Sequence, residues 1–413
     1  MVAPLCSKAG MQRLCLCLAS AALAAGMPCV LKREAGIRCD GTVDDTNSFQ
    51  TLLNNCSTVT VTTDAHCVTL PVQMPSHREL IIQTGAMIQA APHHSWPLRD
   101  KLVSTRPLLS STNTVNITIR GDGEIDGRGA EWWPRSKLDA RPRPRLLTLN
   151  NVTGVLLEGL TLTNPAFWCV LLGGSNMRVA GVRIRAPPFS VAPNTDGIDI
   201  AARNVHIVDV DISNGDDSIC IKSPSANVLV ERSVVRQGNG FVIGTASSGL
   251  PGSSGDTFDV RNVTFRDSVA IDTTFGCHVK AKSPQHGVVR NVTFSNITVT
   301  QTKNATEARV ADHDWAGYAI GIHLLDQGRR RRLHDADNAA SSSTVVAENV
   351  TFRHIRSRGL YAGQFVCSAS NATIGCKGLL FEDVKLNVTR SGCQFVGVEG
   401  RSHGQVTPPS CAL

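Results

Sequence analysis

The chain has 413 residues, of which 18% are charged and 5% aromatic, and its formal net charge is +7. Four of the positive charges form one run, Arg329 to Arg332, and removing them from the total of +7 leaves +3. A balance this modest does not favour a nucleic-acid-binding protein, and no apolar run is long enough to span a membrane. Because aromatic residues are few and glycines abundant, we expect strands and turns around a core of Val, Ile and Leu.

The first residues have the pattern of a secretory signal peptide. Lys8 and Arg13 precede an apolar run from Leu14 to Ala25 that contains small residues near its end. A basic start, a short apolar segment and a small-residue cleavage site are typical of such peptides. We therefore predict that residues 1–25 are a signal peptide and that the protein is secreted, extracellular or in a cell wall. A buried N-terminal helix is the alternative.

Cysteine usage agrees with an oxidising compartment. Three of the 14 cysteines fall in the predicted signal peptide, which leaves eleven. Two short C-terminal loops are expected to be closed by the disulfides Cys367–Cys376 and Cys393–Cys411. One more bridge is expected among Cys39, Cys56 and Cys67, and the odd total leaves at least one thiol free or paired outside the chain. No cysteine or histidine cluster has zinc spacing, so we predict no structural zinc, and we expect no cofactor.

The mature chain begins with a stretch rich in turn residues, EAGIRCDGTVDDTNSFQTLLNNC, which starts at Glu34. Thr46 is expected to be the N-cap of a short helix that runs through Phe49 and Leu53. Alternating, strand-like runs follow it, VTVTT and then ELIIQTGAMIQA. We interpret this region as the N-terminal cap of a longer structure.

The body of the chain repeats a unit of the form Asn-apolar-x-apolar-x-x-apolar-x-apolar. Clear copies begin at Asn176, Asn204, Asn227, Asn262, Asn291 and Asn349, looser ones at Asn116 and Asn151, and a last copy at Lys377. Successive copies are mostly 23 to 35 residues apart, but the largest gap, from Asn291 to Asn349, is 58 residues. We therefore expect one further, degenerate rung around Gly317–Leu325.

The Arg-rich run belongs to an Arg/Ser-rich segment, residues 327–343, inside that gap. We interpret the segment as a disordered surface insertion rather than a nucleic-acid site. A processing site for a protease specific for basic residues is the alternative.

Period-2 apolar segments that recur at this spacing are typical of a β-solenoid, in which each rung buries its inner face by stacking ~4.8 Å from the next. A propeller would need repeats of about forty residues or more, and a sandwich has no reason to repeat the Asn. We predict an all-β fold, a right-handed parallel β-helix with a short N-terminal cap helix. It would form a single domain over residues 26–413, closed by disulfides in residues 367–413.

The recurring Asn residues have a structural interpretation, because Asn tolerates left-handed backbone at a corner and stacked Asn side chains form ladders. Ten Asn-x-Ser/Thr sequons occur, including Asn116, Asn262, Asn291, Asn349 and Asn387. They fit a secreted glycoprotein, but five of the ten fall on the repeated position.

Acidic residues one repeat apart would share a face of such a solenoid. Asp196 and Asp216 differ by 20 positions, and Asp217 and Asn239 by 22, about one turn each. Packing alone would not select this cluster, because adjacent carboxylates repel and their desolvation is costly. Two carboxyl groups on neighbouring rungs are what general acid/base hydrolysis needs.

The chain resembles the polygalacturonases of glycoside hydrolase family 28 in CDGTVDDTNSFQ, ITIRGDGEIDGRGAEWWP, RPRLLTLNNVTGVLLEGLTLTNPAFW, APPFSVAPNTDGIDI and NGDDSICIKS. The resemblance implies a right-handed parallel β-helix that hydrolyses galacturonan-type pectin, an acidic polysaccharide, with inversion and without a metal. By position it implies that Asp216 is the general acid, that Asp196 and Asp217 hold and deprotonate the attacking water, and that Asn194 contacts substrate. An inverting pair stands ~6.5–9.5 Å apart, which side chains on neighbouring rungs can reach.

Two positions depart from the family pattern. Asn239 stands where the family has the His of GHG, and His278 where it has the Arg of RIK, whereas Lys280 is kept. We expect these three residues to bind substrate from the face that carries the acids, His278 and Lys280 together because i and i+2 along a strand point alike. Imidazole grips a carboxylate less well than the bidentate guanidinium does, so the substrate differs from the usual one or turnover is weak.

The function predicted from the sequence is therefore a secreted, monomeric, inverting pectin hydrolase with no nucleic-acid or membrane partner. A degenerate homologue that binds pectin or cell-wall carbohydrate without hydrolysing it is the main alternative. A calcium-dependent pectate lyase on the same fold is less favoured, because it needs a base poised for proton abstraction and a metal site.

Overall fold

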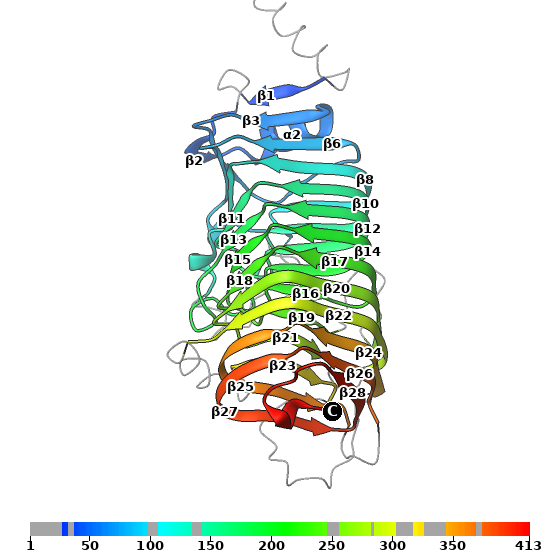
Figure 1. Cartoon of the computed structure of the whole chain (residues 1–413). Helices are drawn as coiled ribbons and strands as arrows, with labels where there is room; N and C mark the ends of the chain where they lie inside the picture. The colour runs from blue at the N-terminus through cyan, green and yellow to red at the C-terminus, as the bar shows by residue number, and fades with distance from the viewer. Residues whose placement is uncertain are drawn as a thin grey trace, which may run out of the picture.

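The computed structural model describes residues 27–31, 37–97, 106–133, 143–245, 256–281, 285–302, 317–325, 344–368 and 374–413. In this part of the chain 28 strands form one continuous sheet that coils along a single axis (Figure 1). Apart from those at the two ends of the coil, the strands pair in parallel with strands one turn before and one turn after them. The predicted parallel β-helix is confirmed. The predicted signal peptide and the Arg/Ser-rich insertion lie outside the described residues.

The coil has three faces, which we number in the order the chain visits them. Strands confined to the first face are β5 (Val72–Gln73), β16 (Ile219–Ile221), β19 (Phe241–Ile243), β21 (Phe275–Lys280) and β23 (Tyr318–His323). Strands that continue from the first face to the second are β8 (Leu109–Gly121), β10 (Leu147–Glu158), β12 (Val170–Ala180) and β14 (Ile198–Val208).

The second face holds the strands β1 (Cys29–Leu31), β3 (Thr58–Val61), β6 (Arg78–Ile82), β17 (Ser225–Glu231), β24 (Thr344–Arg353), β26 (Cys376–Glu382) and β28 (Val398–His403). Two strands continue from the second face to the third, β20 (Thr257–Ile271) and β22 (His286–Thr300).

The third face holds β2 (Asp40–Asp44), β4 (His66–Thr69), β7 (Met87–Ala90), β9 (Glu124–Asp126), β11 (Thr161–Thr163), β13 (Arg183–Arg185), β15 (Asp211–Ser213) and β18 (Val234–Arg236). Two strands lead from it to the next first face, β25 (Arg356–Val366) and β27 (Lys385–Val396). Helical elements are α2 (Thr46–Asn55) and the 3-10 turns η2 (His93–Ser95), η3 (Gly129–Glu131) and η5 (Pro409–Cys411). No helix in the described ranges is long and apolar enough to cross a membrane.

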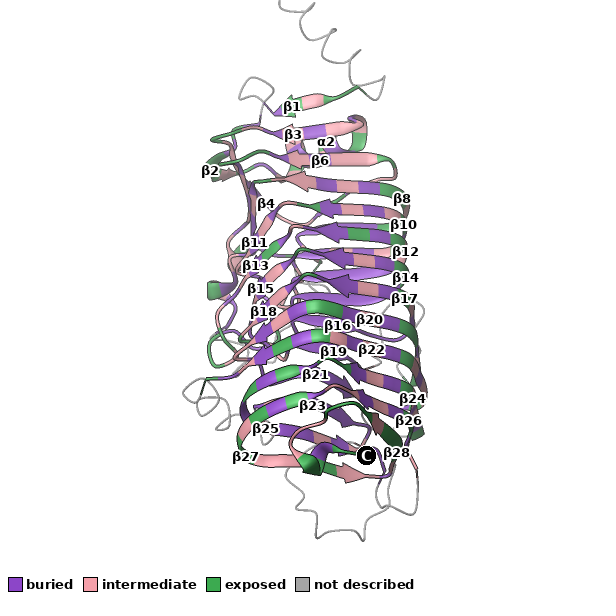
Figure 2. Cartoon of the chain, in the orientation of Figure 1, coloured by how far each residue is buried: buried purple, intermediate pink, exposed green. Residues whose placement is uncertain are grey.

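The interior of the coil is apolar along its whole length, and buried and more exposed residues alternate along the strands of the second face (Figure 2). Val, Ile and Leu fill the N-terminal rungs as expected, but the C-terminal rungs stack phenylalanines in register. The rings of Phe265 and Phe294 are 5.0 Å apart, and those of Phe294 and Phe352 are 5.2 Å apart. The expectation of a core without large rings was therefore wrong for this half, because a low aromatic total says nothing of where the rings gather.

The expected extra rung between Asn291 and Asn349 is also wrong. A strand does occur there, β23, but β22 pairs directly with β24 on the second face. The side chain of Asn349 donates to Asn291 Oδ1 at 3.3 Å, with no rung between them. The 58 residues are therefore a single turn of the coil.

The repeated Asn residues form the predicted ladder where the first face turns into the second. Each adopts left-handed backbone, with φ between 54° and 58°. Each amide nitrogen from Asn204 to Asn349 donates to the Asn one rung earlier, at 3.0 to 3.3 Å. In the sequons at Asn262 and Asn291 this nitrogen, to which a glycan would be attached, is thus a ladder donor. The structural interpretation of these sequons is favoured, and glycosylation stays a prediction for exposed Asn387.

Replacing Asn227 tests the ladder, because its amide donates to Asn204 and accepts from Asn262 and its φ is 58°. We expect Asn227→Ala to lower the free energy of unfolding by about 2 kcal/mol, through lost hydrogen bonds and left-handed strain. Asn227→Gly should lower it by only about 1 kcal/mol, since glycine adopts this φ freely. Denaturant unfolding measures both, and equal losses would argue against backbone strain.

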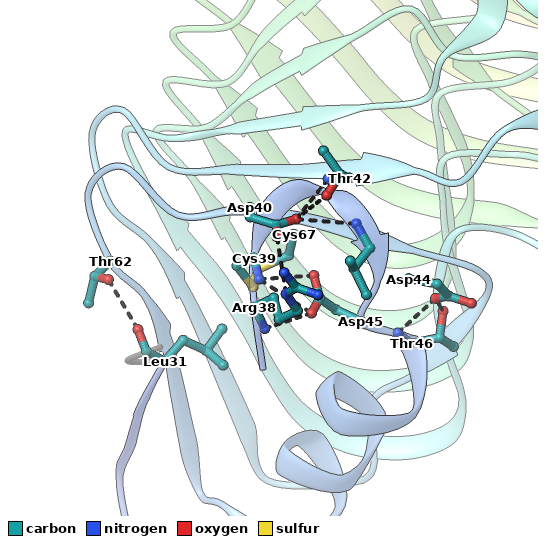
Figure 3. The surroundings of a disulfide bond; sticks show 11 residues. Leu31, Arg38, Cys39, Asp40, Thr42, Asp44, Asp45, Thr46, Thr62 and Cys67 are labelled. Atoms are coloured by element: carbon teal, nitrogen blue, oxygen red, sulfur yellow. Dashed lines mark hydrogen bonds and ion pairs between the residues drawn. A yellow bond between two sulfur atoms is a disulfide. The ribbon is translucent and has the colours of Figure 1, made fainter. Parts of the chain in front are cut away.

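The N-terminal cap departs from expectation in two details, and Figure 3 shows the part of it around Asp45 and the Cys39–Cys67 disulfide. Asp45, not Thr46, is the N-cap of α2, and its carboxylate accepts from the backbone N–H groups of Arg38 and Cys39 rather than from the helix. Two disulfides fasten the cap rather than one, Cys39–Cys67 and Cys29–Cys56. The second bridge uses Cys29, which lies outside the group Cys39, Cys56 and Cys67 from which one bridge was expected.

The two C-terminal disulfides, Cys367–Cys376 and Cys393–Cys411, are as predicted. The three remaining cysteines of the described chain, Cys169, Cys220 and Cys277, are free thiols buried in the first face. Four bridges in all and three buried thiols account for the odd cysteine count.

Candidate active site

Residues just ahead of the first-face strands form one column along the coil. The register aligns Leu147, Val170, Ile198, Ile219 and Phe241 on consecutive rungs. The residues two positions earlier therefore stack in the order Arg145, Trp168, Asp196, Asp217 and Asn239, with rungs ~4.8 Å apart. We call these five residues the site column.

Three carboxyl groups meet in the middle of the site column. One oxygen from each of Asp196, Asp216 and Asp217 lies within 4.8 Å of the others. Asp196 and Asp217 are 4% and 3% exposed, whereas Asp216, beside the column, is half-buried. Asp216 is therefore the carboxyl group of the three that faces solvent most openly.

The turn that carries Asp216 and Asp217 is fixed by a buried asparagine. Asn214 Nδ2 lies 2.9–3.0 Å from the backbone oxygens of Thr195, Asp216 and Asp217, so it ties the turn to the rung of Asp196. Gly238 packs against this turn so closely that a Cβ atom there would lie 2.3 Å from Asn214 Oδ1. The positions of the acids are therefore set by backbone contacts of two rungs.

Asn239, at the position where the sequence departs from the family pattern, bridges two of the acids. Its Nδ2 donates to Asp216 Oδ1 and to Asp217 Oδ1, both at 3.0 Å. Its Oδ1 accepts from Thr274 Oγ1 at 2.9 Å, which orients the amide. A neutral imidazole has a single N–H, so a histidine at this position could donate a hydrogen bond to only one of the two oxygens.

Lys280 and burial divide the acids into unlike groups. Burial alone would raise the pKa of Asp217, but the charges of Lys280 and Lys222 and hydrogen bonds from Lys280 and Asn239 outweigh it, so this pKa lies below its ordinary value. The Lys280 Nζ–Asp217 Oδ1 distance is 2.7 Å. Burial, followed by the charge of Asp217, raises the pKa of Asp216. Burial, followed by the charges of Asp216 and Asp199, raises the pKa of Asp196 as well.

A second lysine, Lys222, lies beneath the acids and was not singled out from the sequence. It is 4% exposed, and its Nζ lies 3.1 Å from Asp199 Oδ1 and 3.9 Å from Asp196 Oδ2. Asp199 is fully buried, and burial raises its pKa to about 6 despite the lysine. Register was the available signal, because Lys222 and Lys280 follow Ile221 and Val279, which align through β19.

His278 lies away from the acids. Its ring is 3% exposed, stacks 4.0 Å from that of Phe275, and shares a 2.9 Å hydrogen bond with His323 Nδ1. Burial, then the charges of His323 and Lys280, keep its pKa well below the ordinary value, so the ring is neutral. His278 and Lys280 both point outward from β21, but only Lys280 reaches the carboxylates. Substrate binding by His278 stays a prediction.

Asn194 lies at the edge of the acid cluster. Its Nδ2 is 3.5 Å from Asp216 Oδ2, and its Oδ1 accepts from Arg143 Nη2 at 2.9 Å. Toward the C-terminus, the site column continues into a stack of Phe275, Tyr318 and Tyr361, with ring separations of 5.4 and 5.0 Å. The site therefore lies between a side with arginines and a side with aromatic rings.

The three close carboxylates also have the spacing of a cation site. Donors of the chain already contact two of the three carboxyl groups: Lys280 and Asn239 both donate to Asp217 Oδ1, and Asn239 also donates to Asp216 Oδ1. The negative charge is thus balanced by protein groups, and we derive no chemical step through a metal.

Residues 78–313 match the family described as glycosyl hydrolases family 28. An endo-polygalacturonase of Pectobacterium carotovorum subsp. carotovorum is 30% identical over 351 residues, which cover 74% of this chain and 83% of that protein. A polygalacturonase of Cryptomeria japonica is 27% identical over 320 residues, 74% of this chain but only 57% of the relative's own length.

Solved structures show the same fold. The polygalacturonase from Erwinia carotovora ssp. carotovora superposes with a TM-score of 0.72 at 22% identity, over 91% of this chain and 97% of that one. Endo-xylogalacturonan hydrolase from Aspergillus tubingensis gives a TM-score of 0.65 at 19% identity, over 93% and 97% of the two chains.

Proposed function

Because the chain belongs to the glycosyl hydrolases of family 28, we propose that it is a polygalacturonase-type enzyme that hydrolyses galacturonan-type pectic polysaccharide. The observation that carries the proposal is the division between Asp216, whose pKa is raised, and Asp217, whose pKa is lowered. Two titratable groups pushed apart in this way are suited to act as acid and base. Relatives that are named polygalacturonases support the substrate class.

In the proposed reaction Asp216, whose pKa is raised and which is the most open of the three acids, gives its proton to the glycosidic oxygen. The bond from that oxygen to the anomeric carbon breaks while a water oxygen attacks the same carbon. Asp217, ionised beside Lys280, takes the proton of the water, and Asp196 orients the water by hydrogen bonding. Proton exchange with solvent then restores both groups. No cofactor takes part in this scheme.

The spacing of the acids differs from what was expected of an inverting pair. Nearest oxygens within 4.8 Å are closer than the ~6.5–9.5 Å that usually leaves room for water between acid and base. We nevertheless propose inversion. In this proposal Asp196 and Asp217 hold the attacking water between them, so the water does not have to fit between Asp217 and Asp216. The product anomer tests this point separately from hydrolysis itself.

Incubation with polygalacturonate should release reducing ends without a product that absorbs in the ultraviolet. Proton NMR during the first minutes should show the anomer opposite to that of the cleaved bond. An ultraviolet-absorbing product would replace the proposal with a lyase, and the retained anomer would refute inversion alone. Failure to cleave homogalacturonan, xylogalacturonan and rhamnogalacturonan would refute the whole proposal.

Secretion and a monomeric state belong to the same proposal. The four disulfides support an oxidising compartment, and the predicted signal peptide would deliver the chain to it. The alternative of a non-catalytic carbohydrate-binding protein rested on the departures at Asn239 and His278. The first of these is built into the acid network, so it gives no ground for preferring an inactive protein.

A further inference from the structure

Arg145 is a charged residue without the partners that buried charges normally have. Its Nε atom is buried and has no hydrogen-bond partner. The guanidinium carbon lies 4.6 Å from the centre of the Trp168 ring, which supports the charge from one side but accepts no hydrogen bond in the plane of the guanidinium. A guanidinium has five N–H donors in a fixed fork, and leaving the buried Nε–H unpaired costs free energy. The position is that of an incomplete binding site.

Its location connects this incomplete site to the acids. Arg145 begins the site column, one rung from Trp168 and two rungs from Asp196. Burial lowers the pKa of Arg145 and the charges of Asp199 and Asp196 raise it, so the guanidinium is within electrostatic reach of the acid cluster. A polymer that lies along the column over Asp216 and Asp217 would therefore extend over Arg145.

Arg143 forms the neighbouring wall of the same site. Its Nη1 donates to the backbone oxygens of Ala166 and Pro193 at 3.0 and 2.6 Å, and its Nη2 donates to Asn194 Oδ1. These three bonds fix the guanidinium beside the acid cluster and leave two of its five N–H donors unassigned. Arg143 is thus a rigid second cation that also holds Asn194 in place.

The other cations of the site are already committed. Lys280 is paired with Asp217, Lys222 with Asp199, and His278 is neutral and buried. A substrate that carries a carboxylate on every sugar unit must nevertheless approach several carboxyl groups of the protein. Guanidinium groups match a carboxylate with two parallel hydrogen bonds, which an imidazole or ammonium does not.

We propose that Arg145, flanked by Arg143, binds the carboxylate of a uronate unit in the bound polysaccharide. It would thereby supply, from the opposite end of the site column, the guanidinium grip that is missing at His278. This inference rests on the proposed function and adds to it a residue that determines specificity for the free acid over its ester.

Binding measured by calorimetry in an Asp216→Asn background, in the full chain, tests the inference without turnover. The probes are a galacturonate oligomer and its methyl ester. Arg145→Met keeps an aliphatic side chain on Trp168 and removes the charge, so it should raise Kd for the acid about 10- to 100-fold, as expected for a charge-assisted hydrogen bond. Kd for the ester should change less than about threefold. Arg145→Lys keeps the charge but loses the paired N–H donors of the guanidinium. Its Kd for the acid should therefore lie between those of the parent and of Arg145→Met.

Arg401→Met is the matched control, because Arg401 is exposed on β28 and its loss changes the net charge equally. It should leave both constants unchanged. Equal weakening of acid and ester by Arg145→Met, or no weakening of either, would overturn the inference. If the Asp216→Asn parent binds neither probe, the substrate proposed above is wrong, and that result is distinct from a failure of Arg145. Should Arg145→Met not fold, an unchanged acid-to-ester ratio in Arg145→Lys overturns the inference equally.

Discussion

Substitution of Asp216 by asparagine is expected to lower kcat by about 10²- to 10⁴-fold on polygalacturonate, the range that a general acid contributes. Asparagine keeps the size of the side chain but cannot transfer a proton to the glycosidic oxygen. Asn239 would still donate to the amide oxygen of the new side chain, and only the 3.5 Å contact from Asn194 Nδ2 would be lost, so folding and KM should change little. Initial rates of reducing-end release measure the effect.

The pH profile separates this role from a structural one. The pKa of Asp216 is raised above the ordinary 3.8, so in wild type the acid stays protonated above that pH and activity falls as pH rises through the raised value. The pKa of Asp217 is lowered, so the base stays ionised and the acidic limb lies below 3.8. The residual activity of Asp216→Asn should keep the acidic limb and lose the alkaline one.

An aryl galacturonide provides the matched control, because its phenolate leaving group needs no protonation. Asp216→Asn should recover most of its rate on this substrate, whereas Asp217→Asn should stay inactive because the water is no longer deprotonated. Equal impairment of Asp216→Asn on both substrates would contradict its assignment as the acid.

The parallel coil and the acids of the site column could be predicted from the sequence because both follow from residue spacing. Because Asp196, Asp217 and Asn239 are one turn apart, parallel stacking of the rungs places their side chains next to one another. Spacing fails where turns lengthen: the interval from Asn291 to Asn349 has the length of two rungs but is one. A count of residues cannot distinguish a longer corner from an additional strand.

Strand alternation correctly predicts that His278 and Lys280 point outward, but not what covers them. Lys280 meets Asp217, whereas His278 lies under Phe275 and beside His323, side chains that come from its own strand and from the next rung. The pair formed by Lys222 and Asp199 was hidden for the same reason. Both residues lie in first-face segments whose inward and outward side chains are buried. A charged residue in such a segment therefore indicates a buried ion pair rather than a position in contact with solvent.

Substitution of Lys222 by methionine is expected to lower the free energy of unfolding at pH 7 by about 3–5 kcal/mol, because it leaves a buried charge without its partner. Asp199, 3.1 Å away and fully buried, would keep its burial and lose its counter-charge. Its pKa, already raised to about 6, should rise further. When the pKa of a carboxyl group is higher in the folded than in the unfolded state, the free energy of unfolding decreases as the pH rises toward the folded-state pKa. The deficit of Lys222→Met should therefore be largest at pH 7 and shrink toward pH 4, as denaturant unfolding at the two pH values can show.

The double variant Lys222→Met/Asp199→Asn decides whether the pair itself is responsible, since it removes both charges at nearly constant volume. Replacing both partners of a buried ion pair costs far less free energy than removing one of them. The double variant should therefore regain most of the unfolding free energy that Lys222→Met loses at pH 7. Its remaining deficit should not depend on pH. Additive losses from the two single substitutions would mean that Lys222 and Asp199 do not interact energetically. A lysine that acts instead through Asp196, 3.9 Å from its Nζ, would leave the stability of Lys222→Met unchanged and lower its kcat. The same four proteins, assayed for both, thus separate a lysine that holds the rungs together from one that tunes the acids above it.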